Sequence, residues 1–326
     1  MLKLIKPKFL IRYYDHSNRL VKILVNYIYD FKNYVKYSGT IKSNSEDILK
    51  GKIIIQYHAI EKGMSLMDRR RKFGSKNLEL LIIYLNKYEQ LDSFLPVCPV
   101  YLNGLVTINK LFQFLDPVDV KVEDLSFFNS RIKYINNKKQ IIQDISINEI
   151  KKFSNIDYEN FLKSRKSIRY FTDKNVDLNV LHRGIDIARN TPSVCNRQGW
   201  RVKIVDEHLM SKSLEAHNGN RGFGHYINKL LVITMDTSYF EGANERNQMY
   251  IDGGLFSINL INSFHSLGLG TIPLNWSADR LQDKKLKNIL EIKNKYTVIM
   301  LLGLGYMPEN NTVPISEKIK HTDILI

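Results

Sequence analysis

The sequence has little cysteine: Cys98 and Cys195 are its 2 cysteines among 326 residues, far apart along the chain. Two such residues cannot build the disulfide framework of a small secreted domain. The 8 histidines are scattered singly, so a cysteine-rich zinc site is excluded and we expect no bound metal. The scarcity of cysteine favours a reducing compartment, and we predict a cytoplasmic protein.

Long apolar runs are also absent. The most apolar stretch near the start is Leu20–Tyr29, but Lys22 and Asn26 interrupt it. No segment approaches the roughly 18 apolar residues that a membrane helix requires. The basic and apolar start, Met1–Lys6, is not followed by an apolar core and a cleavage site. We therefore expect neither a transmembrane segment nor a secretory signal.

Acidic residues are outnumbered, because 33 Asp and Glu face 48 Lys and Arg and leave a net charge of +15. Basic surfaces attract the phosphates of nucleic acids. The chain is also rich in Lys, Asn and Ile, as a low-GC genome would encode, so we attribute the excess charge to codon usage and expect no nucleic-acid partner. With 44% hydrophobic and 25% charged residues, the composition is that of a soluble globular protein.

The length exceeds the roughly 100–200 residues of one ordinary domain, and the pattern changes near residue 150. Residues 1–150 are predicted to be mostly helical, with helices over 26–37, 53–62 and 78–91. Residues 151–326 mix helices and strands without strict alternation, which predicts an α+β domain. Helices are expected there over 157–164, from 177 onward, and over 248–267 and 279–290, with strands over 200–205, 230–235, 271–274 and 296–302.

The first motif that could carry chemistry is Ser164–Phe171, which follows a short predicted helix. Arg165 and Arg169 lie four residues apart, so on a helix they share a face and could converge on one anion. Arginine offers a planar fork that suits phosphate, and Lys166 adds a point charge. The alternative is a solvated basic helix end, where cations meet the negative end of the helix dipole.

A second motif spans Thr191–Trp200. Pro192 ends the preceding helix, and Ser193 and Asn196 then present hydrogen-bonding side chains in a loop before a strand. Side-chain amides carry both donors and acceptors, as the edge of a heterocycle with alternating C=O and N–H groups requires. An ordinary Pro–Ser turn remains the alternative.

The third motif, Gly268-Leu-Gly270-Thr-Ile-Pro273, superficially resembles a dinucleotide-binding fingerprint. Its sixth position is proline and it follows a predicted helix instead of a strand, so the required context is missing. The pair Gly303 and Gly305 is followed by no helix either. We interpret both glycine pairs as turns.

Taken in this order, the motifs resemble those of the FMN-dependent nitroreductase family. The shared elements are Arg-x-Ser-x-Arg, Pro-Ser-x-x-Asn-x-Gln-x-Trp, Gly-Leu-Gly-Thr-x-Pro and a closing apolar strand that runs into a glycine, Val298–Gly305. The resemblance covers roughly 155–326. It implies a mixed, mainly antiparallel sheet flanked by helices, and a homodimer that holds two FMN molecules at the subunit interface.

The resemblance also assigns flavin-binding roles to the first motif. Arg165 and Lys166 correspond to residues at the phosphate, and Ser167 belongs to the same segment. Arg169 corresponds to a cation near flavin N1 and the C2 carbonyl, where it would stabilise the anionic reduced flavin. Near the C-terminus, Lys318 corresponds to a second phosphate cation, with Lys320 as the alternative.

The other two motifs correspond to segments that approach the ring system. The loop that reaches the flavin from the partner subunit corresponds to Pro192, Ser193 and Asn196. The turn that places a backbone N–H against flavin N5 corresponds to Pro273, Leu274 and Asn275. This chain departs from the family pattern where many members have an acidic residue in place of Asn275 and a proline in place of Gly199. It also has Cys195 inside the flavin loop; we expect an inert small side chain there, with a reactive thiol as the alternative.

In the N-terminal half, His58, Glu61 and Lys62 are predicted to share one helical face. One histidine and one glutamate are too few for a metal site. We interpret them as a structural salt-bridged pair, the alternative being a lid or substrate-recognition element over the flavin. The segment also resembles extended nitroreductase-like proteins found with surface-polysaccharide genes.

The resemblance implies a function: two-electron transfer of hydride from NAD(P)H through FMN to an unidentified small-molecule acceptor. No side chain is needed as a nucleophile, so no catalytic residue is assigned. The alternatives are a specialised flavin oxidase or reductase acting on a sugar- or peptide-linked intermediate of surface polysaccharide biosynthesis, and a non-catalytic basic protein that binds membranes or nucleic acid.

Overall fold

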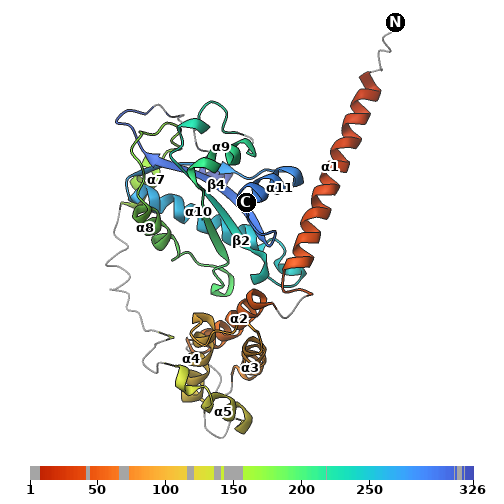
Figure 1. Ribbon diagram of the computed structural model, residues 1–326, viewed down its shortest axis with the longest axis vertical. Coiled ribbons are helices and arrows are strands. Elements are labelled where there is room, and N and C mark those ends of the chain that lie inside the picture. The colour runs from red at the N-terminus through yellow and green to blue at the C-terminus, as the bar shows by residue number, and fades with distance from the viewer. Residues whose placement is uncertain are drawn as a thin grey trace.

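A computed structural model describes residues 8–41, 45–65, 73–115, 121–135, 141–142, 157–217, 219–311, 313, 318 and 320–326. A group of helices forms the N-terminal part, and an α+β part follows it (Figure 1). The first helix projects away from the rest of the molecule.

The N-terminal part is helical, as predicted. Its elements are α1 (Lys8–Tyr37), α2 (Glu46–Ser65), α3 (Ser75–Glu89), α4 (Pro99–Phe114), α5 (Val122–Asn129) and a short 3₁₀ helix, η2 (Ile132–Tyr134). Side chains of α2, α3 and α4 share a dry core that includes Ile53, Leu81 and Leu105, each fully buried. The sequence analysis did not predict α4, although Pro99 at its first turn is a recognised start signal.

The α+β part contains four strands and their flanking helices. The strands are β1 (Trp200–Ile204), β2 (Lys229–Asp236), β3 (Leu269–Asn275) and β4 (Tyr296–Tyr306). The α-helices are α7 (Tyr158–Ser164), α8 (Leu178–Ala188), α9 (Glu207–Glu215), α10 (Gln248–Ser266) and α11 (Arg280–Ile289). The 3₁₀ helices are η3 (Val194–Asn196), η4 (Gly224–Tyr226), η5 (Thr237–Tyr239), η6 (Ala243–Glu245) and η7 (His321–Asp323).

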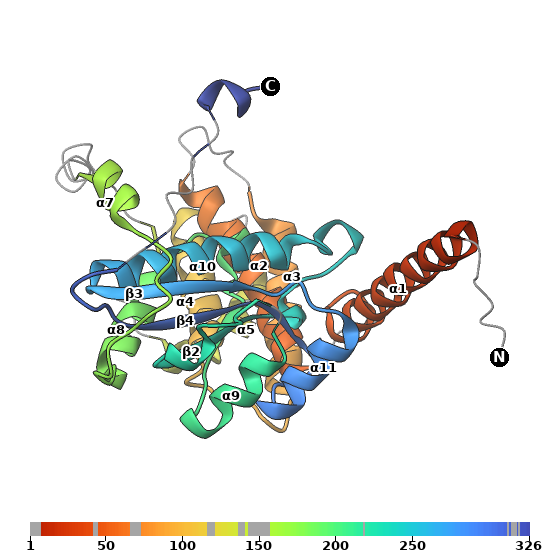
Figure 2. The same cartoon turned by 90° about the horizontal axis from the view of Figure 1, so that it is seen from above.

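The sheet has the order β1-β2-β4-β3, and all three strand pairs are antiparallel. One face packs against α10, through Phe256 and Phe264, with α8 behind it. The opposite face packs against α9 and α11, through Leu214 and Leu286 (Figure 2). This arrangement explains the continuous apolar run of β2, which is buried on both faces. It also confirms the predicted α+β class.

Both glycine pairs were predicted to be turns, but the prediction holds for Gly268 alone, because Gly270 lies inside β3. Gly268 does form a turn, with φ of 79°, between α10 and β3. Gly303 and Gly305, however, lie inside β4. A Cβ on Gly305 would come 2.1 Å from the side-chain oxygen of Asn228, and one on Gly303 would come 2.8 Å from Ile272. Glycine is therefore needed at these positions because neighbouring side chains pack closely against the backbone of β4. The sequence pattern alone does not distinguish this requirement from a turn.

Two predicted helix starts have a side-chain cap. The Asp177 side chain accepts a hydrogen bond from Asn179 N at 2.6 Å at the start of α8. At the start of α11, the Asp279 side chain accepts from Leu281 N and Gln282 N, both at 2.9 Å. The Gln282 side chain accepts from Asp279 N in return and completes a capping box.

Replacing Asp279 with alanine is expected to lower the free energy of unfolding by about 0.5–2 kcal/mol, because two amide donors of α11 lose their acceptor. Urea denaturation measures this loss. Asp206 is the matched control, since it precedes α9 without a capping hydrogen bond from its side chain. An Asp206→Ala loss as large as that of Asp279→Ala would contradict the capping account.

The helical part is joined to the sheet by polar and steric contacts. Lys295 of the α+β part forms ion pairs with Asp236, at 2.8 Å, and with Asp47 of α2. These two carboxylates raise the pKa of Lys295 above its usual range, against the opposing effect of burial. Gly51 of α2 lies so close to Tyr239 that an added Cβ would be 3.1 Å from the Tyr239 Cα. Helix α2 therefore packs directly against the segment that follows β2.

Candidate flavin site

The first and third sequence motifs lie side by side. Ile168 N donates to Thr271 O at 2.9 Å, and Ser167 forms an isolated parallel bridge with Thr271 of β3. Thr172 N then donates to Tyr306 O of β4, also at 2.9 Å. The Arg-x-Ser-x-Arg segment thus runs along the outer edge of β3, which brings two of the predicted flavin-binding segments together.

A half-buried arginine lies at the start of this edge. Arg165 follows α7, and its Nη1 atom is enclosed without a hydrogen-bond partner among the described residues. The Thr271 hydroxyl is likewise enclosed and unpaired within that part of the chain. Burying a charged donor without an acceptor is costly, so this geometry suits an anionic group that would accept from Arg165.

A cavity of about 230 Å³ lies between the Ser164–Ile168 segment, the start of β3 and residues after β4; Thr271 and the carboxylate residue Glu309 line it, whereas Arg165 does not. The exposed Lys166 lines it, together with Thr271 and His265. Arg169 lies farther along the segment, with its guanidinium carbon 5.7 Å from the centre of the Phe223 ring. A larger hollow, about 680 Å³, lies between α9 and the loop before β2, but none of the predicted flavin residues lines it.

His265, at the end of α10, completes the wall of the smaller cavity. Its Nε2 atom lies 2.8 Å from Ser164 Oγ, and its ring centre lies 4.9 Å from that of Phe161. Burial lowers the pKa of His265, and the positive charge of Arg165 lowers it further. The imidazole is therefore neutral near pH 7, so it adds hydrogen-bonding capacity to the cavity and no charge.

The predicted turn before flavin N5 is the end of β3. Leu274 is buried in the core, whereas Pro273 is half-buried and Asn275 is exposed. The Asn275 side-chain amide donates to Ser277 Oγ at 2.9 Å. The backbone carbonyl oxygen of Asn275 accepts a hydrogen bond from His217 Nε2 at 2.8 Å. The backbone here is therefore fixed from two sides, as a segment that presents a backbone N–H must be.

The Pro192–Gln198 loop has an unusual backbone. Cys195, Asn196 and Gln198 all have positive φ, between 50° and 52°. This left-handed conformation costs a residue other than glycine about 1–2 kcal/mol. Ser193 Oγ accepts from Gln198 N at 3.0 Å, and Asn196 Oδ1 accepts from Gln198 Nε2 at 3.1 Å. Pro192 and Asn196 are exposed and Ser193 is half-buried, so the loop presents a polar surface held in a strained shape.

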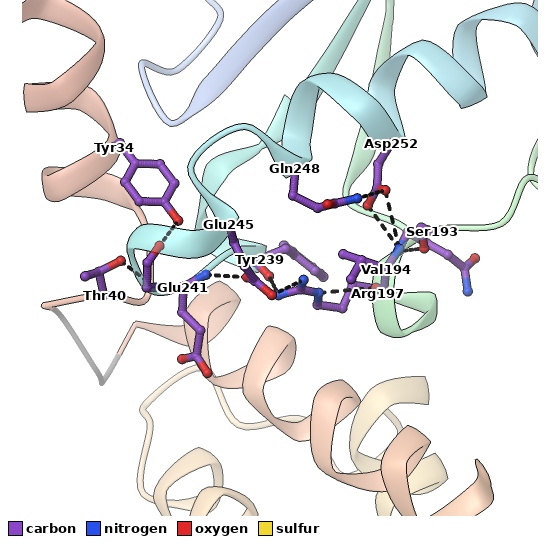
Figure 3. Close-up of polar contacts among 12 residues, drawn as sticks. Tyr34, Thr40, Ser193, Val194, Arg197, Tyr239, Glu241, Glu245, Gln248 and Asp252 are labelled. Carbon is purple, nitrogen blue, oxygen red and sulfur yellow. Dashed lines mark hydrogen bonds and ion pairs between the residues drawn. The ribbon is translucent and has the colours of Figure 1, made fainter. Parts of the chain in front are cut away.

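Two buried charged groups hold the loop in place (Figure 3). Asp252 of α10, only 1% exposed, accepts from Val194 N at 3.2 Å and from Gln248 Nε2 at 2.8 Å. Burial raises the pKa of Asp252, and these hydrogen bonds oppose that effect. Arg197 has a fully buried guanidinium that binds both carboxylate oxygens of Glu245, at 2.7 and 2.8 Å, and donates to Tyr239 O at 2.7 Å.

The loop and the cationic cavity lie at opposite ends of α10. Asp252 holds the loop, whereas His265 lines the cavity, and the two residues are thirteen positions apart on one helix. At 1.5 Å per residue, this separation is about 20 Å. This distance applies to Val194; Thr191, just before the loop, accepts from Asn259 Nδ2 of α10 at 2.8 Å and lies nearer to the cavity.

The remaining sequence predictions concern the C-terminus and the N-terminal half. Lys318 is exposed, and the residues on either side of it, 317 and 319, lie outside the described part. His58 Nδ1 lies 3.4 Å from Glu61 Oε2 on α2. Burial and the charge of Lys62 lower the pKa of His58. At this distance the two side chains form the expected helical pair when the imidazole is protonated.

Comparison with known proteins bears on the α+β half. Residues 162–220 match the sequence model of the Nitroreductase family. The C-terminal half of the chain is related to this family. A 4-nitrobenzoate reductase of Pseudomonas putida is 24% identical over 208 residues, which cover 48% of this chain and 88% of that protein.

Solved structures of nitroreductases also align with this half. A nitroreductase family protein from Streptococcus pneumoniae TIGR4 is 19% identical, with a TM-score of 0.45, and covers 52% of this chain and 98% of its own. An FMN-dependent nitroreductase from Clostridium difficile R20291 is 21% identical, with a TM-score of 0.44, and covers 51% of this chain and 96% of its own. The family match, over residues 162–220, does not include the N-terminal helices.

Several residues of the site were not predicted from sequence. Asp252 is the lone acidic residue of α10, and an isolated carboxylate in an apolar helix is a signal that could have found it. Arg197 and Glu245 are 48 residues apart and carry no local signal. His265 precedes the Gly268 turn by three residues, but only the folded chain brings it to Ser164.

Within the described part of the chain, no cluster of three or more His, Cys, Asp or Glu side chains could hold a metal ion. The same residues include no helix long and apolar enough to cross a membrane.

Proposed function

We propose that this protein is an FMN-dependent oxidoreductase that transfers hydride from NAD(P)H through FMN to a small-molecule acceptor. The observation that carries the proposal is the enclosed, unpaired Arg165 Nη1 beside β3, in a segment related to nitroreductases. The donor set fits the phosphate of FMN: Arg165 and Lys166 supply cations, and the Thr271 hydroxyl is enclosed and unpaired within the described residues.

When bound, FMN supplies the redox chemistry, and the protein supplies binding, orientation and electrostatics. Arg165 and Lys166 would neutralise the phosphate, with Lys318 as a further cation. Arg169 would favour negative charge on the reduced ring system. The backbone of Pro273, Leu274 and Asn275 would hold the reacting edge in place.

We also propose a homodimer in which each Pro192–Gln198 loop serves the flavin of the other subunit. The roughly 20 Å along α10 between the Val194 part of the loop and the cavity of one chain supports this arrangement. So does an exposed apolar stripe on α10: Ile251 is 56% exposed, Leu255 43% and Ile258 44%. These positions are spaced four and three residues apart, so they share one face. A second subunit would cover the side of α10 that a single chain leaves exposed.

The purified protein is expected to be yellow and to release FMN on heating. Anaerobic addition of NADH or NADPH should bleach the flavin absorbance, and a nitroaromatic acceptor should restore it in a ping-pong cycle. A protein that is colourless and does not take up added FMN would refute the proposal. Denatured protein treated with the same FMN is the control for nonspecific binding.

The acceptor class has an alternative, a sugar- or peptide-linked intermediate of surface polysaccharide biosynthesis. Flavin that binds but is not bleached by NADH or NADPH would favour this specialised role, because the reductant would then be the substrate itself. The N-terminal helices, which the family match does not include, would shape its pocket.

Helix α1 gives a specific reason to keep a non-catalytic alternative. Its polar side contacts the protein: Asn26 accepts from Arg280 N at 2.7 Å, and Tyr29 OH donates to Asp283 at 2.7 Å. Its apolar side faces outward, with Leu24 59%, Tyr27 70% and Phe31 67% exposed. Such a face suits a membrane surface or a partner protein. If the protein neither binds nor reduces flavin, salt-sensitive binding to anionic vesicles would support that role.

A further inference from the structure

We propose that Arg197 is a positioning residue through which the N-terminal helices fix the Pro192–Gln198 loop, and thereby set the affinity for flavin. The inference rests on the proposed FMN function. It assigns a role to the N-terminal half that is separate from any lid over the flavin.

The first step is the burial of Arg197. Its side chain has no exposed surface, and it donates four hydrogen bonds, to both oxygens of the Glu245 carboxylate, to Tyr239 O and to Val194 O. Arg197 Nε donates to Val194 O at 3.3 Å, so the Arg197 side chain also holds the backbone of its own loop (Figure 3). Arg197 thus ties the strained loop to the 239–245 segment that follows β2.

The second step is that the N-terminal part holds the 239–245 segment from the other side. Tyr34 OH of α1 donates to Gly242 O at 2.7 Å, and Gly242 N donates to Thr40 Oγ1 at 2.9 Å. Gly39 N donates to Phe240 O at 2.9 Å. Lys52 of α2 lies 3.5 Å from the Glu241 carboxylate.

The third step concerns Glu245, which joins the two sides. One of its carboxylate oxygens accepts from both Arg197 Nη1 and Glu241 N, each at 2.8 Å. Hydrogen bonds therefore connect α1 to Gly242 and Glu241 to Arg197 through Glu245, and the peptide bond between Glu241 and Gly242 joins the two sets. Figure 3 shows the Glu245 carboxylate between the Glu241 backbone and Arg197, whereas the Glu241 side chain points away.

The fourth step is the strain in the loop. Three left-handed residues that are not glycine persist only where surrounding contacts hold them. Asp252 holds the Val194 end and Arg197 holds the other end. If the Arg197 contacts are lost, the loop can relax to ordinary φ values, and Ser193 and Asn196 move away from the positions in which the flavin would meet them.

The test uses the full-length dimeric protein and two measurements. The first is the dissociation constant for FMN, from quenching of flavin fluorescence. The second is the rate at which a maleimide labels Cys195, a half-exposed loop residue, with Cys195→Ser reporting the background from the buried Cys98. This labelling rate reports the loop in apoprotein and does not depend on flavin.

Arg197→Met and Glu245→Gln are expected to weaken FMN binding by about tenfold or more, since each breaks a buried bidentate pair. Both should also accelerate Cys195 labelling. Arg197→Lys retains the charge but loses the bidentate geometry. Its FMN affinity and its Cys195 labelling rate should lie between those of Arg197→Met and of the wild type. The double variant, Arg197→Met with Glu245→Gln, should bind FMN no more weakly than Arg197→Met alone, because both changes remove the same interaction.

Tyr34→Phe tests the link to the N-terminal helices without altering a buried charge. It removes the hydrogen bond to Gly242 and should weaken FMN binding about twofold to fivefold, as loss of one such bond predicts. Tyr27→Phe is the matched control on the same helix, because Tyr27 faces outward and is 70% exposed. It should change neither measurement.

The outcomes separate this inference from the proposed function. If wild-type protein binds no FMN, the proposed function fails, and Cys195 labelling still tests whether Arg197 positions the loop. If wild-type protein binds FMN but Arg197→Met and Tyr34→Phe leave both the affinity and the labelling rate unchanged, the inference is overturned. A lower melting temperature alone, with both measurements unchanged, would likewise make Arg197 merely structural and overturn it.

Discussion

Replacing Arg165 with alanine is expected to abolish retention of FMN through purification. Arg165 is half-buried beside β3, and its enclosed Nη1 atom has no acceptor among the described residues. Removing a buried group that binds a charged partner costs about 2–5 kcal/mol. This loss corresponds to affinity weaker by roughly 30-fold to several thousand-fold. Absorbance near the flavin band, measured against protein concentration, gives the retained fraction.

Two further variants make this result specific. Arg165→Lys keeps a cation but loses the planar fork, so it should retain part of the flavin. Arg183→Ala removes an exposed arginine of α8 and should retain all of it. Unchanged flavin content in Arg165→Ala, in a protein that binds FMN as wild type, would refute the assignment of the phosphate site.

The second large effect is expected on α10. Leu255→Asp places a charge at the centre of the exposed stripe formed by Ile251, Leu255 and Ile258. If a second subunit covers this stripe, an unpaired carboxylate is buried there and the dimer should dissociate. Flavin should be lost with it, because each loop would no longer reach the other subunit. Analytical ultracentrifugation and flavin absorbance measure both changes.

Leu178→Asp is the control for this experiment. Leu178 is 57% exposed at the start of α8, where an acidic residue is compatible with the helix dipole. That variant should keep its dimer and its flavin. A dimeric Leu255→Asp protein with a full complement of FMN would contradict the proposed subunit interface.

Local signals predicted much of the α+β half. The caps Asp177 and Asp279 begin helices as expected, and α10 spans Gln248–Ser266 against an expected 248–267. These features depend on a few neighbouring residues, so the sequence contains them directly. The first and third motifs were also expected to serve one site, and the structure places Ser167 beside Thr271.

Other features depend on contacts that no local pattern encodes. Gly303 and Gly305 were predicted to form a turn, but they lie in β4 because Ile272 and Asn228 leave no room for a Cβ. The Arg197–Glu245 pair joins residues far apart in sequence, and its burial follows only from the packed segments around it. Whether Arg165, Lys318 and the other assigned residues bind flavin stays a prediction.

Helix α1 illustrates the same limit at the N-terminal end. The expected helix over 26–37 is the last part of a helix that begins at Lys8. Aromatic residues, some of them at helical spacing, were the basis of that prediction. In the structure Tyr27 and Phe31 point outward, and Tyr29 and Tyr34 make the polar contacts with the body. Periodicity identified the helix, but it did not identify which side faces the protein.

The most direct test of the shared flavin site is a mixed dimer of two defective chains. One chain carries Arg165→Ala and an intact loop; the other carries Ser193→Ala with Asn196→Ala and an intact cavity. Two different affinity tags isolate the mixed dimer after co-expression. If each site combines the cavity of one chain with the loop of the other, the mixed dimer will retain one FMN and each parent homodimer close to none. A mixed dimer as free of flavin as its two parents would contradict the shared site.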